Sequence, residues 1–363
     1  MTSGTDAAMS HEPLAVGPLA AEAGGNAEAG LPPVFLPADD QLHIAMMSDR
    51  WWETETAWFS FHHPERKLGG WLYTMIRPNI GTVAGGVWIW DDTAYLPWEV
   101  PYSANYTALE LPSDLDFRDA VLPNGVTMRV LEPTMSYALN YDDGDRLSVD
   151  LRFDGVMPPE PLTAVGSTFG SAHHFDQLGR VSGSITLHGE IIDIDCLGMR
   201  DRTWGPRPEN RPRRAAYVTG AASADHAFLA VTNVRADEDL VAYGFLRRDG
   251  RTVSLLEGSR TVTRDGEHGW VISIVIDAVD SEGRRLHAVG EPVSRIIVNR
   301  HTFIDINSLV RWDLNGETGW GEDQDMWPMH TFSATQRLRR AARSETGGSE
   351  KGLAEIDTSR AEG

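Results

Sequence analysis

A run of charged and aromatic residues just past the middle of the chain is the stretch best suited to chemistry. This signature segment reads Gly198-Met199-Arg200-Asp201-Arg202-Thr203-Trp204-Gly205-Pro206-Arg207. A buried carboxyl group near guanidinium groups can give or take a proton, because burial and charge change its pKa. We therefore expect Asp201 to be an acid or base, and Arg202 and Arg207 to bind a ligand oxygen. Alternatively, Asp201 forms a buried ion-pair network with the arginines that only stabilises the fold.

The strand that leads into the signature segment determines which side chains share a face. Alternation places Ile192, Ile194 and Cys196 on one face and Asp193 and Asp195 on the other. If the strand simply continued, Trp204 would lie on the first face and Asp201 on the opposite one. A bulge or turn near Thr203-Trp204-Gly205-Pro206 would bring Asp201 and Trp204 together. We expect this break, because a site containing both side chains requires it.

A second candidate segment lies upstream and reads His173-His174-Phe175-Asp176-Gln177. We interpret it as a loop in which His174 acts as an acid, a base or a hydrogen-bond donor at a cavity mouth. A purely structural loop histidine is the alternative. No metal site is predicted, because neighbouring histidines in a loop rarely face one ion and no further ligand is close in sequence.

Aromatic residues are concentrated in the first half of the chain and suggest a pocket wall. Trp88 and Trp90 alternate with apolar residues, so both indoles lie on one face of a strand. Tyr73 and Trp204 are assigned to the same substrate-binding wall. Such a wall suits apolar or cationic ligands, although aromatic residues also fill ordinary barrel cores. Glu322 and Asp323, in a glycine-acid-tryptophan cluster near the C-terminus, are further binding candidates; a solvated acidic run is the alternative.

Short strand-like segments separated by turn residues favour an all-β fold. They recur about every ten residues, which is typical of a barrel or sandwich. We predict a β domain over 36–158, ending at a proline-rich stretch, and a second over 159–340. Segments 1–35 and 341–363 have compositions typical of disorder, and one helical turn is expected at 43–47.

Composition excludes several classes of function. The chain of 363 residues has 53 acidic and 32 basic side chains and a net charge of −21, which disfavours nucleic acid as a partner. It contains no apolar run long enough to span a membrane and no secretory signal, and its single cysteine fits a reducing compartment. We therefore expect a cytoplasmic protein.

No phosphate-binding loop or nucleophile elbow appears, and no cofactor is predicted. The oligomeric state stays open, with a homodimer as one alternative.

The run Arg-Asp-Arg-Thr-Trp-Gly-Pro-Arg resembles the signature of tandem lipocalin-like proteins related to AttH and the carotenoid 1,2-hydratases. The histidine segment at 173–177 is also similar to one just upstream of that signature. The resemblance covers nearly all of residues 36–340. It implies two lipocalin-like antiparallel barrels or half-barrels with a ligand cavity near their interface. Arginines stand here where those hydratases have histidines, and arginine cannot shuttle a proton at neutral pH.

These observations favour a cofactor-independent lyase of the hydratase type, an isomerase or a cyclase that uses acid/base catalysis. The expected partner is a hydrophobic small molecule such as a terpenoid, sterol-like or polycyclic compound, and the arginines favour an oxygenated one. The alternatives are a non-catalytic carrier of an apolar metabolite and a partner-binding β scaffold.

Overall fold

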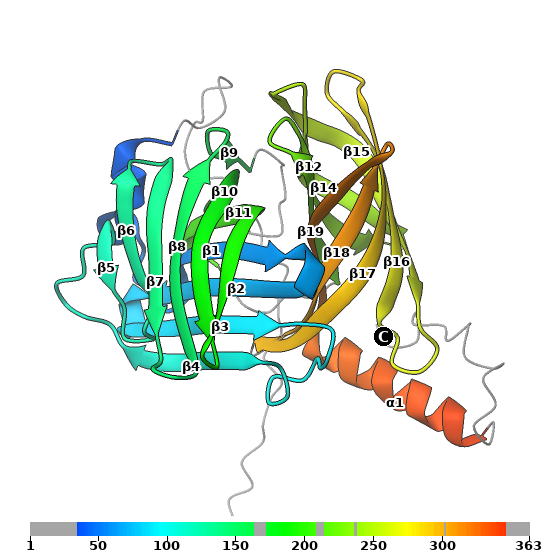
Figure 1. The fold of residues 1–363 in the computed structure, drawn as a ribbon, viewed down its shortest axis with the longest axis horizontal. Coiled ribbons are helices and arrows are strands. Elements are labelled where there is room, and N and C mark those ends of the chain that lie inside the picture. The colour runs from blue at the N-terminus through cyan, green and yellow to red at the C-terminus, as the bar shows by residue number, and fades with distance from the viewer. Residues whose placement is uncertain (1–34, 163–171, 208–213, 236–237, 301–302, 346–363) are drawn as a thin grey trace, which may run out of the picture. The chain divides into compact units, whose positions relative to one another are not determined.

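Antiparallel strands in two sheets make up most of the computed structural model (Figure 1). The structure describes residues 35–162, 172–207, 214–235, 238–300 and 303–345. Within these residues, one sheet has eleven strands and stays open, while the other closes into a barrel of eight strands. The predicted all-β fold is therefore confirmed, with one closed barrel and one curled half-barrel.

The open sheet contains the first eleven strands and holds the signature segment at its centre. In space the order is β4-β3-β2-β1-β11-β10-β8-β7-β6-β5, with β9 beside β10. The strands are β1 (Glu53–His63), β2 (Leu68–Arg77), β3 (Thr82–Trp90), β4 (Tyr102–Glu110), β5 (Asp119–Val121), β6 (Thr127–Glu132), β7 (Ser136–Asp142), β8 (Leu147–Gly155), β9 (Glu160–Pro161), β10 (His173–Leu187) and β11 (Glu190–Pro206). Four short 3₁₀ turns accompany them: η1 (Pro37–Asp40), η2 (Ile44–Met46), η3 (Pro64–Arg66) and η4 (Pro78–Ile80). η2 confirms the expected turn at 43–47.

The closed barrel follows from residue 215 onward. Its strands are β12 (Ala215–Ser223), β13 (His226–Arg235), β14 (Glu238–Arg248), β15 (Arg251–Arg264), β16 (Val271–Asp280), β17 (Arg285–Arg300), β18 (Phe303–Leu314) and β19 (Glu317–Pro328). Each strand pairs with the next, and β19 pairs with β12 to close the ring. The change of sheet therefore falls between Pro206 and Ala215, well after the expected boundary at 158. It does so because β10 and β11 pair with β8 and β1 of the first sheet.

A single α-helix, α1 (Met329–Glu345), follows the barrel in the described part of the chain. It begins directly after β19, and Phe332 packs its ring against Trp270 and Trp327 of the barrel. The expected disorder from residue 341 is thus wrong for 341–345, because this helix continues through them. Residues 346–363, and 1–34 of the N-terminal segment, lie outside the described residues.

Both faces of the open sheet are covered by apolar side chains. Its inner face carries a core that includes Phe59, Tyr137 and Phe153. Its barrel-facing side carries Trp58 and the neighbouring indoles. These side chains form one cluster with residues of β12, β14 and β17, which includes Trp58, Trp71, Trp88, Tyr217, Tyr243 and Val298. A third cluster fills the barrel itself. Polar residues on either side of the open sheet can therefore be buried.

No helix among the described residues has the length and apolar character that crossing a bilayer requires.

Candidate active site

β11 carries the signature segment as one continuously paired strand as far as Pro206, with a positive φ of 108° at Gly205. Asp201 lies directly opposite Asp176 of β10 and Trp58 of β1. Residues directly opposite one another in neighbouring strands project from the same face, so all three lie on the barrel-facing side. The prediction of a break before Pro206 is wrong, because the pairing of β11 with β1 continues through Trp204 and Gly205 without a shift of register. Trp204 therefore lies on the inner face, opposite to Asp201. The supposed loop at 173–177 is also wrong, because these residues pair with β11 as the start of β10.

A buried polar group, which we call the acid cluster, surrounds Asp176. Tyr217 donates its hydroxyl hydrogen bond to Asp176 Oδ1 at 2.6 Å, and Tyr243 donates to Oδ2 at 2.5 Å. His174 Nε2 lies 3.2 Å from each of these oxygens, and its Nδ1 lies 2.8 Å from Thr203 Oγ1. The members of the acid cluster are His174, Asp176, Asp201, Thr203, Tyr217 and Tyr243. The barrel strands β12 and β14 thus supply hydroxyl donors to a carboxylate of the open sheet.

Asp201 is the carboxyl group of the acid cluster whose pKa is shifted toward neutral pH. Its pKa is raised to about 6, first by burial and then by the negative charge of Asp176, against the opposing effects of His174, Arg207 and Arg300. A carboxyl group with this pKa populates both its acid and its base form near neutral pH. Asp201 is also partly exposed, whereas Asp176 is fully buried. Asp201 is therefore the more accessible residue of this pair of aspartates.

The tyrosines of the acid cluster remain donors over the accessible pH range. Burial raises the pKa of Tyr217 and of Tyr243 well above the ordinary value, and the charge of Asp176 raises both further. Both hydroxyls therefore keep their protons and direct them at Asp176.

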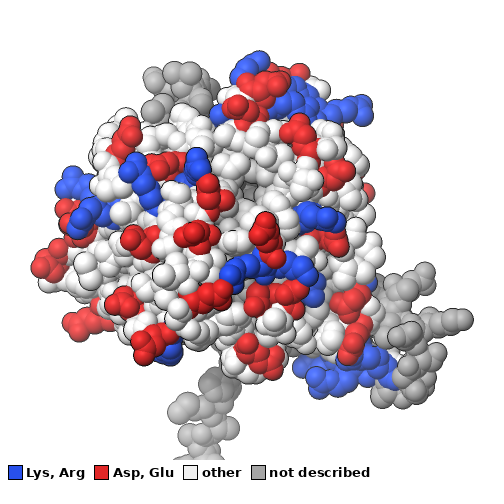
Figure 2. Space-filling model, in the orientation of Figure 1, with Lys and Arg blue, Asp and Glu red and all other residues white. Residues whose placement is uncertain are grey.

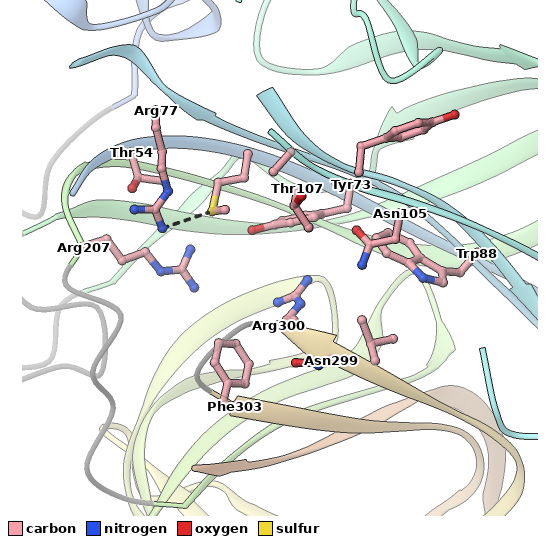
Figure 3. A pocket seen from close by; sticks show the side chains of 15 residues that line it. Thr54, Tyr73, Arg77, Trp88, Asn105, Thr107, Arg207, Asn299, Arg300 and Phe303 are labelled. Carbon is pink, nitrogen blue, oxygen red and sulfur yellow. Dashed lines mark hydrogen bonds between the residues drawn. The ribbon is translucent and has the colours of Figure 1, made fainter. Parts of the chain in front are cut away.

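A pocket opens where β2, β3 and β4 face the junction of β17 and β18 (Figure 3). The empty space among its side chains is about 630 Å³. This volume includes open solvent at the mouth, so the enclosed part is smaller. The described lining residues are Thr54, Tyr73, Met75, Arg77, Ala84, Gly85, Trp88, Asn105, Tyr106, Thr107, Arg207, Val298, Asn299, Arg300 and Phe303. Tyr73, Trp88 and Arg207 are thus brought together, although Trp90 is not among them.

Two arginines connect the pocket to the acid cluster. Arg207 and Arg300 line the pocket, and their charges also lower the pKa of Asp201. Arg300 lies over the ring of Tyr73, with its Cζ 4.5 Å from the ring centroid. Asp201 and His174 are not among the described lining residues, so the charges of Arg207 and Arg300 are the link between the pocket and the acid cluster.

The structure does not bring Arg202 and Trp204 together with Asp201. Both are buried on the inner face, where Arg202 donates to Glu55 Oε2 at 2.7 Å. Trp204 stacks on His43, with ring centroids 4.1 Å apart. The ion-pair alternative thus describes Arg202, whereas Asp201 forms no ion pair with any described residue.

Glu322 and Trp90 are buried between the sheets, outside the pocket lining. Glu322 accepts a hydrogen bond of 2.8 Å from Trp71 Nε1. Burial raises the pKa of Glu322 to about 8, and Asp305 raises it while hydrogen bonds from Trp71 and Asn307 lower it. Trp90 packs edge-on against Trp71 at 5.6 Å.

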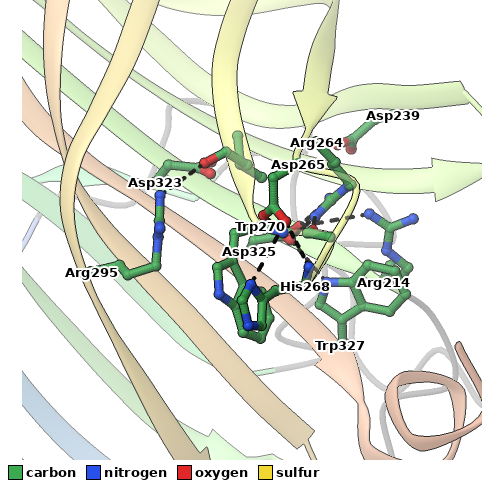
Figure 4. Close-up of polar contacts among 12 residues, drawn as sticks. Arg214, Asp239, Arg264, Asp265, His268, Trp270, Arg295, Asp323, Asp325 and Trp327 are labelled. Carbon is green, nitrogen blue, oxygen red and sulfur yellow. Dashed lines mark hydrogen bonds and ion pairs between the residues drawn. The ribbon is translucent and has the colours of Figure 1, made fainter. Parts of the chain in front are cut away.

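Asp323 lies inside the barrel, in an ion-pair network that is separate from the acid cluster (Figure 4). Arg260 donates to both Asp323 oxygens, at 2.9 and 2.7 Å, and Arg264 donates to both oxygens of Asp325, at 2.6 and 3.0 Å. We call this group the barrel network; its members are Arg214, Asp239, Arg260, Arg264, Asp323 and Asp325. Its compact pairing indicates a structural role for Asp323.

Sequence reasoning missed four residues of the site: Asp176, Tyr217, Tyr243 and Arg300. The spacing of His174 and Asp176 did contain a signal, since residues two apart share a face once the segment is a strand. Nothing in the sequence joins the tyrosines to Asp176. Among the described residues, no three or more His, Cys, Asp or Glu side chains are grouped as a metal site.

Comparison with known proteins agrees with this architecture. A crystal structure of an AttH-like protein from Nitrosomonas europaea aligns with a TM-score of 0.54 at 13% identity, covering 84% of this chain and 98% of that chain. Kievitone hydratase from Nectria haematococca aligns with a TM-score of 0.52 at 11% identity, covering 82% and 94%. These similarities confirm the expected AttH-like lipocalin fold. Curated protein sequences give no match. The model of a family described as a domain of unknown function, DUF7064, matches residues 36–327, so the chain belongs to that family.

Proposed function

We propose that this protein is a hydratase, isomerase or cyclase that acts through its own acid and base side chains on a hydrophobic, oxygenated small molecule. The observation that carries the proposal is Asp201, a half-buried residue opposite Asp176 whose carboxyl group has its pKa raised to about 6, mainly by burial. Kievitone hydratase is by name a hydratase and has the same fold. That likeness is compatible with the proposed reaction class, which rests on the site itself.

The reaction begins with proton transfer from Asp201. Protonated Asp201 gives its proton to an alkene carbon or a carbonyl oxygen of the ligand, and its carboxylate later recovers one from water or from a neighbouring carbon. Asp176 stays hydrogen-bonded to Tyr217 and Tyr243, so its charge keeps favouring the protonated form of Asp201. Because the two neighbouring carboxyl groups have different surroundings, we assign the role of the acid to Asp201.

The pocket positions the ligand. Arg207 and Arg300 bind a ligand oxygen by charge-assisted hydrogen bonds, while Trp88 and Tyr73 contact the apolar body. Their ring faces also stabilise positive charge that develops after protonation. A terpenoid, sterol-like or polycyclic substrate fits this combination.

Incubation with candidate substrates in isotopically labelled water tests the proposal. Terpenoids, sterols and polycyclic aromatics are incubated with the native protein, with Asp201→Asn and with Asp193→Asn, a matched change at an exposed aspartate of the same strand. Mass spectrometry then detects label in the product or a new isomer. We expect Asp201→Asn to lower turnover by about 10²–10⁴-fold, and Asp193→Asn to retain it.

Equal turnover by both variants would contradict the role of Asp201. Ligands retained by the protein but recovered unchanged from every variant would instead support a carrier of apolar metabolites.

A further inference from the structure

The pocket concentrates positive charge in an acidic protein. The described residues that line it include three arginines, Arg77, Arg207 and Arg300, and neither Asp nor Glu. The chain as a whole has a net charge of −21, and acidic side chains are distributed over the face drawn in Figure 2. Such a local excess of guanidinium groups is a recognition feature for an anion.

The three arginines come from separate parts of the chain and converge on one space. Arg77 ends β2, Arg207 follows β11 and Arg300 ends β17. Their guanidinium groups point into the pocket together with the hydroxyl of Tyr73 (Figure 3). A ligand at this point can therefore receive hydrogen bonds from both the open sheet and the barrel.

Partial burial makes an anionic partner favourable for these cations. Arg77 is buried, and Arg207 and Arg300 are half-buried. The carboxylate paired with Arg300 is Asp305, at 3.9 Å, which is longer than a charge-assisted hydrogen bond. Guanidinium groups removed from water gain more from a bound carboxylate than exposed ones do.

The remaining wall suits an apolar body attached to the charged group. Trp88, Met75, Val298 and Phe303 line the pocket. Aromatic and aliphatic side chains of this kind bury the hydrocarbon part of a ligand. The pocket thus combines a cationic region with an apolar one.

We propose that the pocket binds an organic carboxylate with an apolar body, held by Arg207 and Arg300. This inference rests on the proposed function only in taking the pocket as the substrate site. It excludes neutral hydrocarbons as preferred ligands. Arg77 contributes to the same positive field.

Matched acids and esters test this preference. Binding of 2-naphthoate and abietate is compared with that of their methyl esters by isothermal titration calorimetry at neutral pH. We expect each acid to bind at least about tenfold more tightly than its ester, with a preference that falls as salt rises. Arg207→Gln and Arg300→Gln should each reduce the preference severalfold, whereas Arg311→Gln, an exposed pair partner on the barrel, should leave it unchanged.

A second variant keeps the test decisive if an arginine variant does not fold. Asn105→Asp places a carboxylate on the pocket wall at an exposed position with little change in shape, and it should abolish the preference for the acid. Equal binding of acid and ester by the native protein, or a preference that survives Asn105→Asp, would overturn the inference.

The Asp201→Asn variant separates this inference from the proposed function. A preserved preference for acids without turnover by any variant means that the pocket assignment holds and the catalytic proposal fails. Turnover of neutral substrates without a preference for acids means the reverse.

Discussion

The acid cluster and the barrel network both bury aspartates, yet their partners differ. In the barrel network, Asp323 and Asp325 each receive two hydrogen bonds from an arginine. In the acid cluster, Asp176 accepts hydrogen bonds from two neutral hydroxyl groups and lies 3.2 Å from His174 Nε2, and Asp201 forms no ion pair with any described residue. The difference shows how the partners of a buried carboxyl group affect its pKa. A nearby guanidinium group lowers the pKa and favours the charged form, whereas burial without such a partner raises the pKa toward neutral pH.

The pKa directions express this contrast for Asp325 but not for Asp323, whose pKa is raised by burial and by the charge of Asp325 although Arg260 lowers it. Burial opposes the charge of Asp325, but Arg264, Arg260 and Arg214 more than offset it and lower its pKa. For Asp201 burial prevails and the pKa rises to about 6. The barrel network therefore serves stability, and the acid cluster can serve proton transfer.

The largest expected effect comes from breaking the barrel network. Asp323→Asn removes a buried carboxylate that binds Arg260 in two places, and it leaves that guanidinium less compensated. We expect the free energy of unfolding to fall by about 3–5 kcal/mol, measured by urea denaturation.

The matched control breaks a surface pair on the same barrel. Glu291→Gln removes a partner of Arg311 in a pair whose side chains are 61% and 56% exposed, and it should change the free energy of unfolding by less than about 1 kcal/mol. A similar small loss for Asp323→Asn would contradict the structural role of the network.

A smaller effect, visible only as a pH dependence, is expected at Glu322. Its folded pKa of about 8 exceeds the ordinary 4.5, so the folded state binds this proton more tightly than the unfolded state. The resulting stability is fully present below about pH 4.5 and is lost as the pH rises to about 8. Glu322→Gln keeps an acceptor for Trp71 and removes the ionisation. We therefore expect the variant to be more stable than the native protein by roughly 2 kcal/mol at pH 8, within the upper limit of about 5 kcal/mol set by linkage.

Urea denaturation at pH 5 and pH 8 measures this difference. The exposed Glu65→Gln is the control and should show the same stability as the native protein at both values. A Glu322→Gln variant that is no more stable than the native protein at pH 8 would show that Glu322 ionises normally.

Much of the fold could be predicted because strand alternation and turn residues are local signals. Ile192, Ile194 and Cys196 are buried while Asp193 and Asp195 are exposed, as alternation predicts. Alternation also placed Asp201 and Trp204 on opposite faces. We expected a break because a site containing both side chains requires one. The barrel instead covers the second face of the sheet, so Asp201 is placed in a polar cluster without Trp204.

The site itself could be predicted only in part. Asp201 and Arg207 follow from the signature segment, but Tyr217 and Tyr243 reach Asp176 only because two sheets pack together. No local pattern reports that packing. Asp323 was assigned to the site for the same reason. Its pairing with Arg260 depends on β15 and β19 meeting inside the barrel, which no local pattern reports either.

The central claim is that Asp201 is an acid whose pKa is brought near neutral pH by burial and, to a smaller extent, by its position opposite Asp176. The most direct measurement is a carbon-13 NMR titration of the aspartate carboxyl groups, with the Asp201 signal assigned by its loss in Asp201→Asn. Our account predicts an apparent pKa of about 6 for Asp201, and a lower value in Asp176→Asn because a neighbouring negative charge is removed. An Asp201 signal that titrates near the ordinary 3.8 would contradict the account.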